Sequence, residues 1–207
     1  MRSDEFAERL AAPTPAPGGG AAAARVGSFA AALARMAAGI TLRRAPEGER
    51  EPLEAASAEA EKILRAFQKL EEEDAEAFEG YLRARRAPEA GPEAEGRRAE
   101  AVREALERAT AAPLAMIERS LDVLRLVERI LELEPRVKIR ARADLFAAVE
   151  LAEATVRIAS ANALENVSGL GAAARGAQGR LADLIRSFDE LRDRLTARLR
   201  APRPGAG

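Results

Sequence analysis

Apolar residues recur at spacings of three and four along most of the chain, and runs that alternate apolar with polar residues are almost absent. Spacings of three and four place side chains on one face of an α-helix, whereas a half-buried β-strand needs alternation. The pattern therefore predicts an all-α fold, a bundle of about six helices with orthogonal or up-down packing.

Proline and glycine clusters interrupt the periodic segments and predict the helix boundaries. We expect helices over approximately residues 3–12, 21–40, 51–86, 97–133, 139–167 and 180–200. Pro113 lies inside the fourth helix and predicts a bend or an interruption there, because proline removes one backbone hydrogen bond. We expect residues 171–179 to form a mobile loop and residues 201–207 a disordered tail, with residues 1–200 as one domain.

Composition limits the chemistry that the chain can perform. Its 207 residues include no Cys and no His, which excludes disulfides, thiolate nucleophiles, the usual zinc sites and imidazole bases. Proton transfer in an enzyme of this composition would fall to carboxylates or, failing those, to one of three Lys or the single Tyr81.

Charge and hydropathy argue against nucleic acid and membranes as partners. The chain has 33 Lys and Arg against 34 Asp and Glu, and aromatic residues are only 3%. A basic face and stacking platforms for bases are therefore missing. The Ala-rich segment 18–41 is broken by Arg25 and Arg35, and no signal peptide opens the sequence. We expect a cytoplasmic protein.

Asp74 interrupts the apolar stripe of the third helix. Ala60, Ile63, Phe67 and Leu70 form the stripe, which continues after Asp74 at Ala77, Phe78 and Tyr81. A carboxylate on the buried face of a helix needs an ion-pair or hydrogen-bond partner. Without one, burial raises its pKa and favours the protonated form. Asp74 is therefore either the partner of an Arg from a neighbouring helix or a general acid/base prepared by burial.

Polar side chains also gather on one face of the fifth helix. Asp144, Thr155, Asn162 and Asn166 fall within about 40° of one another at 100° per residue. Small residues separate them, which indicates a polar floor with space above it. This face predicts either a pocket between helices or a buried hydrogen-bond network that fixes helix register.

Three glycines lead directly into the second helix. Gly18, Gly19 and Gly20 follow Pro17 and allow a ligand to approach the backbone. The start of a helix also presents free N–H groups, so this segment suits a carboxylate or another anion, although a glycine hinge is an equally common use of such a sequence.

These segments, taken together, resemble the cyclodeaminase domain of formiminotransferase-cyclodeaminase and its stand-alone bacterial relatives, which include methenyltetrahydrofolate cyclohydrolases. The resemblance covers about residues 3–195. The motifs that carry it are Pro17-Gly18-Gly19-Gly20 with the following Ala-rich helix, Asp74-Ala75-Glu76-Ala77-Phe78, Pro113, Arg142-Ala143-Asp144-Leu145, and the pair Asn162 and Asn166.

The resemblance implies a helical homodimer with a folate site in a cleft near the subunit interface. It assigns Asp74 as the catalytic acid/base, and it implies substrate binding by Gly18, Gly19, Gly20, Asp144, Asn162 and Asn166. The implied reaction is cyclisation of 5-formiminotetrahydrofolate to 5,10-methenyltetrahydrofolate with release of ammonia, or hydrolysis of the methenyl form to 10-formyltetrahydrofolate. No metal or other cofactor is implied, because the tetrahydrofolate derivative is the substrate.

The sequence departs from the family pattern at Ala21 and Ala143, where Ser is usual, and at Leu42, where the family has an aromatic or Gly-Lys-rich stretch. Two hydroxyls near the expected pocket are therefore lost. Two alternatives to a folate enzyme follow: a helical module that binds folate or another ligand without chemistry, and a structural helical-bundle dimer in which buried Asp and Asn only fix register.

Overall fold

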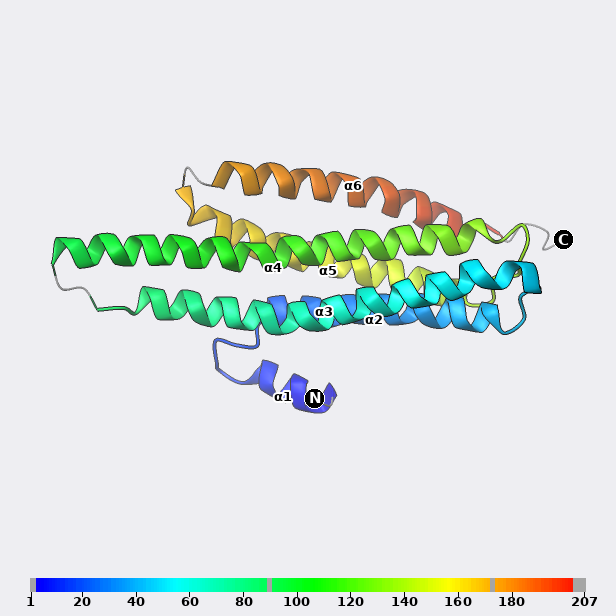
Figure 1. Cartoon of the computed structure of the whole chain (residues 1–207), viewed down its shortest axis with the longest axis horizontal. Coiled ribbons are helices and arrows are strands. Elements are labelled where there is room, and N and C mark those ends of the chain that lie inside the picture. The colour runs from blue at the N-terminus through cyan, green and yellow to red at the C-terminus, as the bar shows by residue number, and fades with distance from the viewer. Residues whose placement is uncertain (1–2, 89–90, 172–173, 203–207) are drawn as a thin grey trace.

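A computed structural model describes residues 3–88, 91–171 and 174–202 of the chain. Within these residues every regular element is helical, which confirms the all-α prediction (Figure 1). The elements are α1 (Ser3–Ala11), α2 (Gly19–Leu42), the short 3₁₀ turn η1 (Glu47–Glu49), α3 (Arg50–Arg85), α4 (Pro92–Glu132), α5 (Arg142–Ser168) and α6 (Ala174–Arg200).

Helices α2 to α6 form an up-and-down bundle, the second of the two expected packings. Each helix runs antiparallel to the one before it, with α3 and α4 in front of α2 and α5, and with α6 beside α4 and α5 (Figure 1). The end of α3, the start of α4 and the end of α5 lie toward one end of the molecule, and α2 begins partway along the bundle (Figure 1). Helix α1 is not part of this bundle and contacts α2 from outside it (Figure 1).

The two halves of the bundle approach closely because α2 presents small residues to its neighbours. A side chain at Gly27 would overlap the ring of Phe67 in α3, so glycine is required for this contact. On the side facing α5, Thr155 is fully buried and its Oγ1 donates to the carbonyl of Ala23 at 3.2 Å. The core between these helices is built from the alanines of α2 and larger residues of α3, α4 and α5.

Two predicted boundaries were wrong. α6 begins at Ala174, inside the segment expected to be a loop, because Ala174 is buried against Leu106, Val167 and Leu170 and this packing supports the first turn. α4 begins at Pro92 rather than after residue 96, since proline is well suited to the first turn of a helix. Part of the expected loop and most of the expected tail, residues 172–173 and 203–207, lie outside the described residues.

Pro113 does not interrupt α4, which runs unbroken through it. Proline lacks the N–H that would bond to the carbonyl four residues earlier, so the carbonyl of Ala109 loses its intrahelical donor. The Nδ2 of Asn166 in α5 donates to this carbonyl at 2.9 Å. The side chain of one helix therefore satisfies the backbone that the proline of another leaves unpaired.

None of the helices in the described part of the chain is both long enough and apolar enough to cross a lipid bilayer. The Ala-rich α2 was the one segment for which the sequence raised the question, and twelve of its residues are instead buried within the bundle.

The contact between Asn166 and Ala109 predicts a coupling with Pro113. We expect Asn166→Ala to lower the free energy of unfolding by about 1–2 kcal/mol, because it leaves a partly buried carbonyl without a donor. In a Pro113→Ala background the backbone N–H at position 113 supplies that donor, so the same substitution should cost about 1 kcal/mol less. Urea denaturation of the four proteins in a double-mutant cycle measures this difference.

Asn162→Ala provides the control, because the Asn162 side chain makes no hydrogen bond within the described part of the chain. We expect it to change stability by less than about 0.5 kcal/mol in either background. Equal costs of Asn166→Ala with and without Pro113 would contradict the coupling.

Candidate active site

A cavity of about 460 Å³ lies where the start of α2 meets the later parts of α3 and α5 and the first half of α4. We call it the Asp74 cavity. Its volume falls within the range of sites that hold small molecules. The glycines at the start of α2 form one wall, and the lining includes Gly18, Gly19, Gly20, Asp74, Phe78, Tyr81, Leu106, Ala109, Asn162, Glu165 and Asn166.

The carboxylate of Asp74 lies directly against the start of α2. A side chain at Gly20 would overlap both carboxylate oxygens, so any larger residue there would displace the carboxylate of Asp74 from this position. The backbone N–H of Ala21, one of the first N–H groups of α2 without an intrahelical acceptor, donates to Asp74. Since the contact uses backbone, a serine hydroxyl at position 21 is not needed for it.

Asp74 makes no ion pair with any Arg or Lys in the described parts of the chain. The sequence left open whether an Arg of a neighbouring helix balances this carboxylate, and none of the described arginines does. Instead, burial raises the pKa of Asp74 above its usual value, and the hydrogen bond from the Ala21 N–H opposes part of that increase. A carboxyl group whose pKa is raised in this way holds its proton more firmly than an exposed one, which suits a general acid/base.

The two asparagines of α5, Asn162 and Asn166, both line the Asp74 cavity. Asn166 uses its Nδ2 on the Ala109 carbonyl, so its amide has a structural function at the cavity wall. Asn162 is half-buried and makes no hydrogen bond within the described part of the chain, which leaves both its donor and its acceptor for a ligand.

Asp144 does not reach this cavity. It lies in the first turn of α5, 18 residues before Asn162, which is about 27 Å along a helix. The predicted common face exists, since Thr155 between them faces α2. Angular position alone, however, takes no account of distance along the axis. The adjacent Arg142 is buried and pairs with Glu134, so this end of α5 is a packing site.

Several residues of the cavity were not predicted as site residues. Phe78 and Tyr81 form a tilted aromatic pair with ring centroids 6.2 Å apart, and Glu165 lies beside Asn166. Leu106 and Ala109 come from α4, whose sequence gives no polar signal there. The one usable signal was Pro113, because a proline in a helix implies a free carbonyl four residues earlier.

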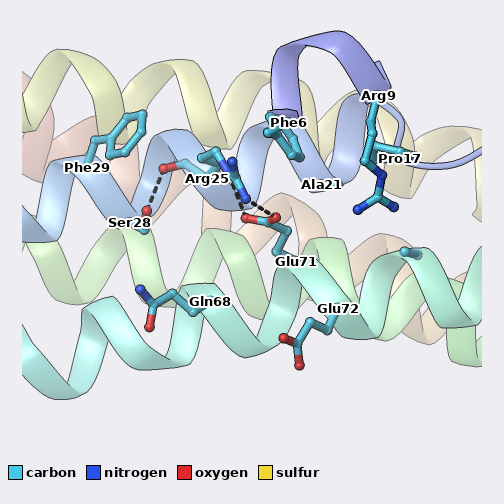
Figure 2. Close-up of a pocket in the computed structure, with 11 residues that line it drawn as sticks. Phe6, Arg9, Pro17, Ala21, Arg25, Ser28, Phe29, Gln68, Glu71 and Glu72 are labelled. Carbon is cyan, nitrogen blue, oxygen red and sulfur yellow. Dashed lines mark hydrogen bonds and ion pairs between the residues drawn. The ribbon is translucent and has the colours of Figure 1, made fainter. Parts of the chain in front are cut away.

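A second cavity, of about 560 Å³, lies on the other side of the α2–α3 contact (Figure 2). We call it the Arg25 cavity. The Nε of Arg25 donates to Glu71 at 2.9 Å, and the Phe6 ring of α1 covers the guanidinium, whose carbon lies 3.6 Å from the ring centroid. The contact of the Phe6 ring with this guanidinium holds α1 on the bundle. Because the charges of Arg25 and Glu71 balance each other, Asp74 is the better candidate for chemistry.

Comparisons with known proteins identify the family of the chain. The family model described as formiminotransferase-cyclodeaminase matches residues 2–178. A methenyltetrahydrofolate cyclohydrolase of Methylorubrum extorquens is 32% identical over 168 residues, which is 81% of this chain and 79% of that protein. A formimidoyltransferase-cyclodeaminase of Sus scrofa is 34% identical over 78% of this chain, although the match spans only 30% of the pig protein.

A solved structure also has the same fold. It is described as a formiminotetrahydrofolate cyclodeaminase of Thermotoga maritima and superposes with a TM-score of 0.84 at 24% identity, covering 96% of both chains. The family model covers most of the chain, and the cyclohydrolase relative is matched over 79% of its own length. The chain belongs to the formiminotransferase-cyclodeaminase family.

Proposed function

We propose that this chain is a folate enzyme that acts on a one-carbon substituent, and that it hydrolyses 5,10-methenyltetrahydrofolate to 10-formyltetrahydrofolate. The observation that carries the proposal is the carboxyl group of Asp74, half-buried and without a cationic partner in the described residues, at the wall of a ligand-sized cavity. The name of the Methylorubrum extorquens relative, matched over 79% of its length, supports hydrolysis.

The chemistry of hydrolysis suits a carboxyl group in this setting. The methenyl carbon carries a positive charge shared with two nitrogens, so an ionised Asp74 attracts the substrate. Asp74 then accepts a proton as water forms its bond to the methenyl carbon. When the bond from that carbon to N5 breaks, Asp74 returns the proton to N5, and the new hydroxyl loses its proton to solvent as the formyl group forms.

Cyclodeamination is the second candidate, supported by the 34% identity with the pig formimidoyltransferase-cyclodeaminase. In that reaction N10 of 5-formiminotetrahydrofolate forms a bond to the formimino carbon, and ammonia leaves. The leaving nitrogen must be protonated, and a carboxyl group whose pKa is raised by burial is a suitable donor. Both reactions therefore require the same residue in the same cavity.

The other residues of the Asp74 cavity have complementary functions in this proposal. Phe78 and Tyr81 provide aromatic surface for the flat rings of a folate. Asn162 provides a free amide that can bond to the pterin or to the one-carbon group. Gly18 and Gly19 leave the backbone open to the ligand, while Asp74 itself occupies the anion position at the start of α2 that the glycine motif suggested for a folate carboxylate.

We also propose that the chain acts as a homodimer, as the family resemblance implies. Large apolar side chains on the surface support association: Phe29 is 51% exposed, Met36 41% and Leu164 55%.

The first prediction from this proposal concerns turnover. We expect Asp74→Asn to lower the rate of methenyl hydrolysis by about 10²- to 10⁴-fold, because the amide cannot accept and return a proton. Absorbance of the methenyl chromophore measures the reaction, as accelerated loss from 5,10-methenyltetrahydrofolate or as appearance from 5-formiminotetrahydrofolate. Accelerated loss of the chromophore indicates hydrolysis, and its appearance from 5-formiminotetrahydrofolate indicates cyclodeamination.

Glu76→Gln is the matched control, since it changes an exposed carboxylate two residues away that does not line the cavity. We expect it to retain full activity. Full activity of Asp74→Asn would remove Asp74 from the mechanism. If the wild-type protein binds either folate but does not accelerate its reaction, the chain is a folate-binding module and not an enzyme.

The second prediction concerns pH and stability. The folded-state pKa of Asp74 is raised above its unfolded value of about 3.9, so ionisation at neutral pH opposes folding. The stability that the protonated form provides is fully present below the unfolded-state pKa, and it is lost as pH rises through the folded-state pKa. We therefore expect Asp74→Asn to be at least as stable as wild type to urea at pH 7, with an advantage that shrinks toward about pH 4. A less stable variant at pH 7 would contradict this assignment.

A further inference from the structure

The charged residues that line the Asp74 cavity are all of one sign. Among the described lining residues they are Asp74 and Glu165, and the lining contains no Arg or Lys. The Nη1 of Arg85 donates to the Tyr81 hydroxyl at 3.4 Å, but Arg85 is exposed and does not line the cavity. In a chain with 33 Lys and Arg against 34 Asp and Glu, this cavity is therefore a local region of negative potential.

The charge of Glu165 is not balanced within the described part of the chain. Glu165 is exposed and makes no ion pair there. Other exposed carboxylates of the bundle, such as Glu79 and Glu107, pair with an Arg one turn away on their own helix. The positions one turn from Glu165 carry no cation, because they are Ala161, Asn162, Ser168 and Gly169. The negative charge of Glu165 can therefore act on a ligand in the cavity.

The last turn of α5 holds Glu165 in a fixed place at the cavity. The Oγ of Ser168 donates to the carbonyl of Glu165 at 2.6 Å, which stabilises this turn. The bond from Asn166 to the carbonyl of Ala109 ties the same turn to α4. Because backbone bonds and packing position the residue, its carboxylate needs only side-chain rotation to meet a ligand.

The other lining residues also suit a flat cation. Phe78 and Tyr81 offer the faces of two aromatic rings, which attract a delocalised positive charge. The glutamate tail of a folate, in contrast, carries carboxylates that meet no Arg or Lys in this lining. The cavity therefore favours entry of the one-carbon end of a folate, with the tail toward solvent.

Asp74 alone cannot hold a cation throughout the reaction proposed above. Its carboxyl group gains and then returns a proton, and while protonated it has no charge with which to attract the substrate. Burial raises its pKa, and Glu165 does not contribute to that increase, so the two carboxylates do not share a proton. Glu165 can therefore keep its charge while Asp74 changes its own.

We propose that Glu165 is a specificity-determining residue, through which the Asp74 cavity selects folates with a cationic one-carbon group over folates with a neutral one. The methenyl group is a cation, and the formimino group is an amidine that is protonated in neutral water. The formyl product is neutral, so the attraction ends when hydrolysis is complete and product release is favoured. The inference rests on the function proposed above and adds the charge class of its substrate.

The test compares the binding of two folates that have the same tail. 5,10-Methenyltetrahydrofolate carries the charge, and 5-formyltetrahydrofolate has a neutral one-carbon group. Titration calorimetry in the Asp74→Asn chain, where turnover is slow, isolates Glu165. Adding Glu165→Gln should raise the dissociation constant of the methenyl form by about threefold to tenfold and should not raise that of the formyl form. The difference should shrink at high salt.

Kinetics of the chain with native Asp74 provide a second measurement. Glu165→Gln should raise KM for 5,10-methenyltetrahydrofolate by a similar factor and leave kcat within about twofold, because Glu165 transfers no proton in the reaction. Glu165→Asp keeps the charge and should retain most of the preference for the cation. A fall in kcat with KM unchanged would overturn the proposal, since it would place Glu165 in the chemical step.

Glu150→Gln is the matched control. It removes the same charge from an exposed position of α5 that is 15 residues from Glu165, about 22 Å along the helix, and does not line the cavity. An equal loss of preference in this variant, or no loss in Glu165→Gln, would overturn the proposal while leaving the folate enzyme intact. If the wild-type chain binds neither folate, the proposed function fails together with this inference, so the two failures are distinguishable.

Discussion

The close contact between α2 and α3 is the constraint on which the rest of the structure depends. Gly20 meets the carboxylate of Asp74, and Gly27, seven residues later, meets the ring of Phe67. The two partners on α3 are also seven residues apart, so both contacts belong to one antiparallel register. The same register aligns Arg25 with Glu71. A shift of one turn along either helix would break all three contacts and would move Asp74 away from the start of α2.

This register gives Asp74 its chemical character. A carboxyl group in the middle of a long helix would ordinarily be solvated or paired with an Arg. Here the glycine at position 20 lets the backbone of α2 approach so closely that water is displaced, which raises the pKa, while the Ala21 N–H supplies one hydrogen bond that keeps the ionised form accessible. The glycines that the sequence suggested for a ligand anion are therefore used first by a carboxylate of the protein itself.

Much of the fold could be predicted from apolar periodicity, because each long helix buries a continuous face. The errors lie where tertiary contacts override local signals. Ala174 begins a helix within a glycine-rich segment because it packs on Leu106, and Pro113 is accepted in α4 because Asn166 supplies a substitute donor. The residues Asp74, Asn162 and Asn166 were recognisable as polar interruptions of apolar faces. Asp144 shares their face but lies too far along the axis. Leu106 has no distinguishing pattern in the sequence, and Ala109 is indicated only by Pro113, four residues later.

The bond from Asn166 to the carbonyl of Ala109 has a consequence for how this chain can change over time. Pro113 and Asn166 are far apart in sequence and do not bond to each other, yet both act on the carbonyl of Ala109. Pro113 leaves this carbonyl without a backbone donor, and Asn166 supplies a substitute. A lineage that loses the proline regains a backbone donor and frees the amide for a different use at the cavity wall. A lineage that loses the amide first leaves a carbonyl unpaired. The two positions are therefore coupled in evolution. Replacing Pro113 first keeps the carbonyl bonded at every step, whereas replacing Asn166 first passes through an intermediate in which it is unpaired.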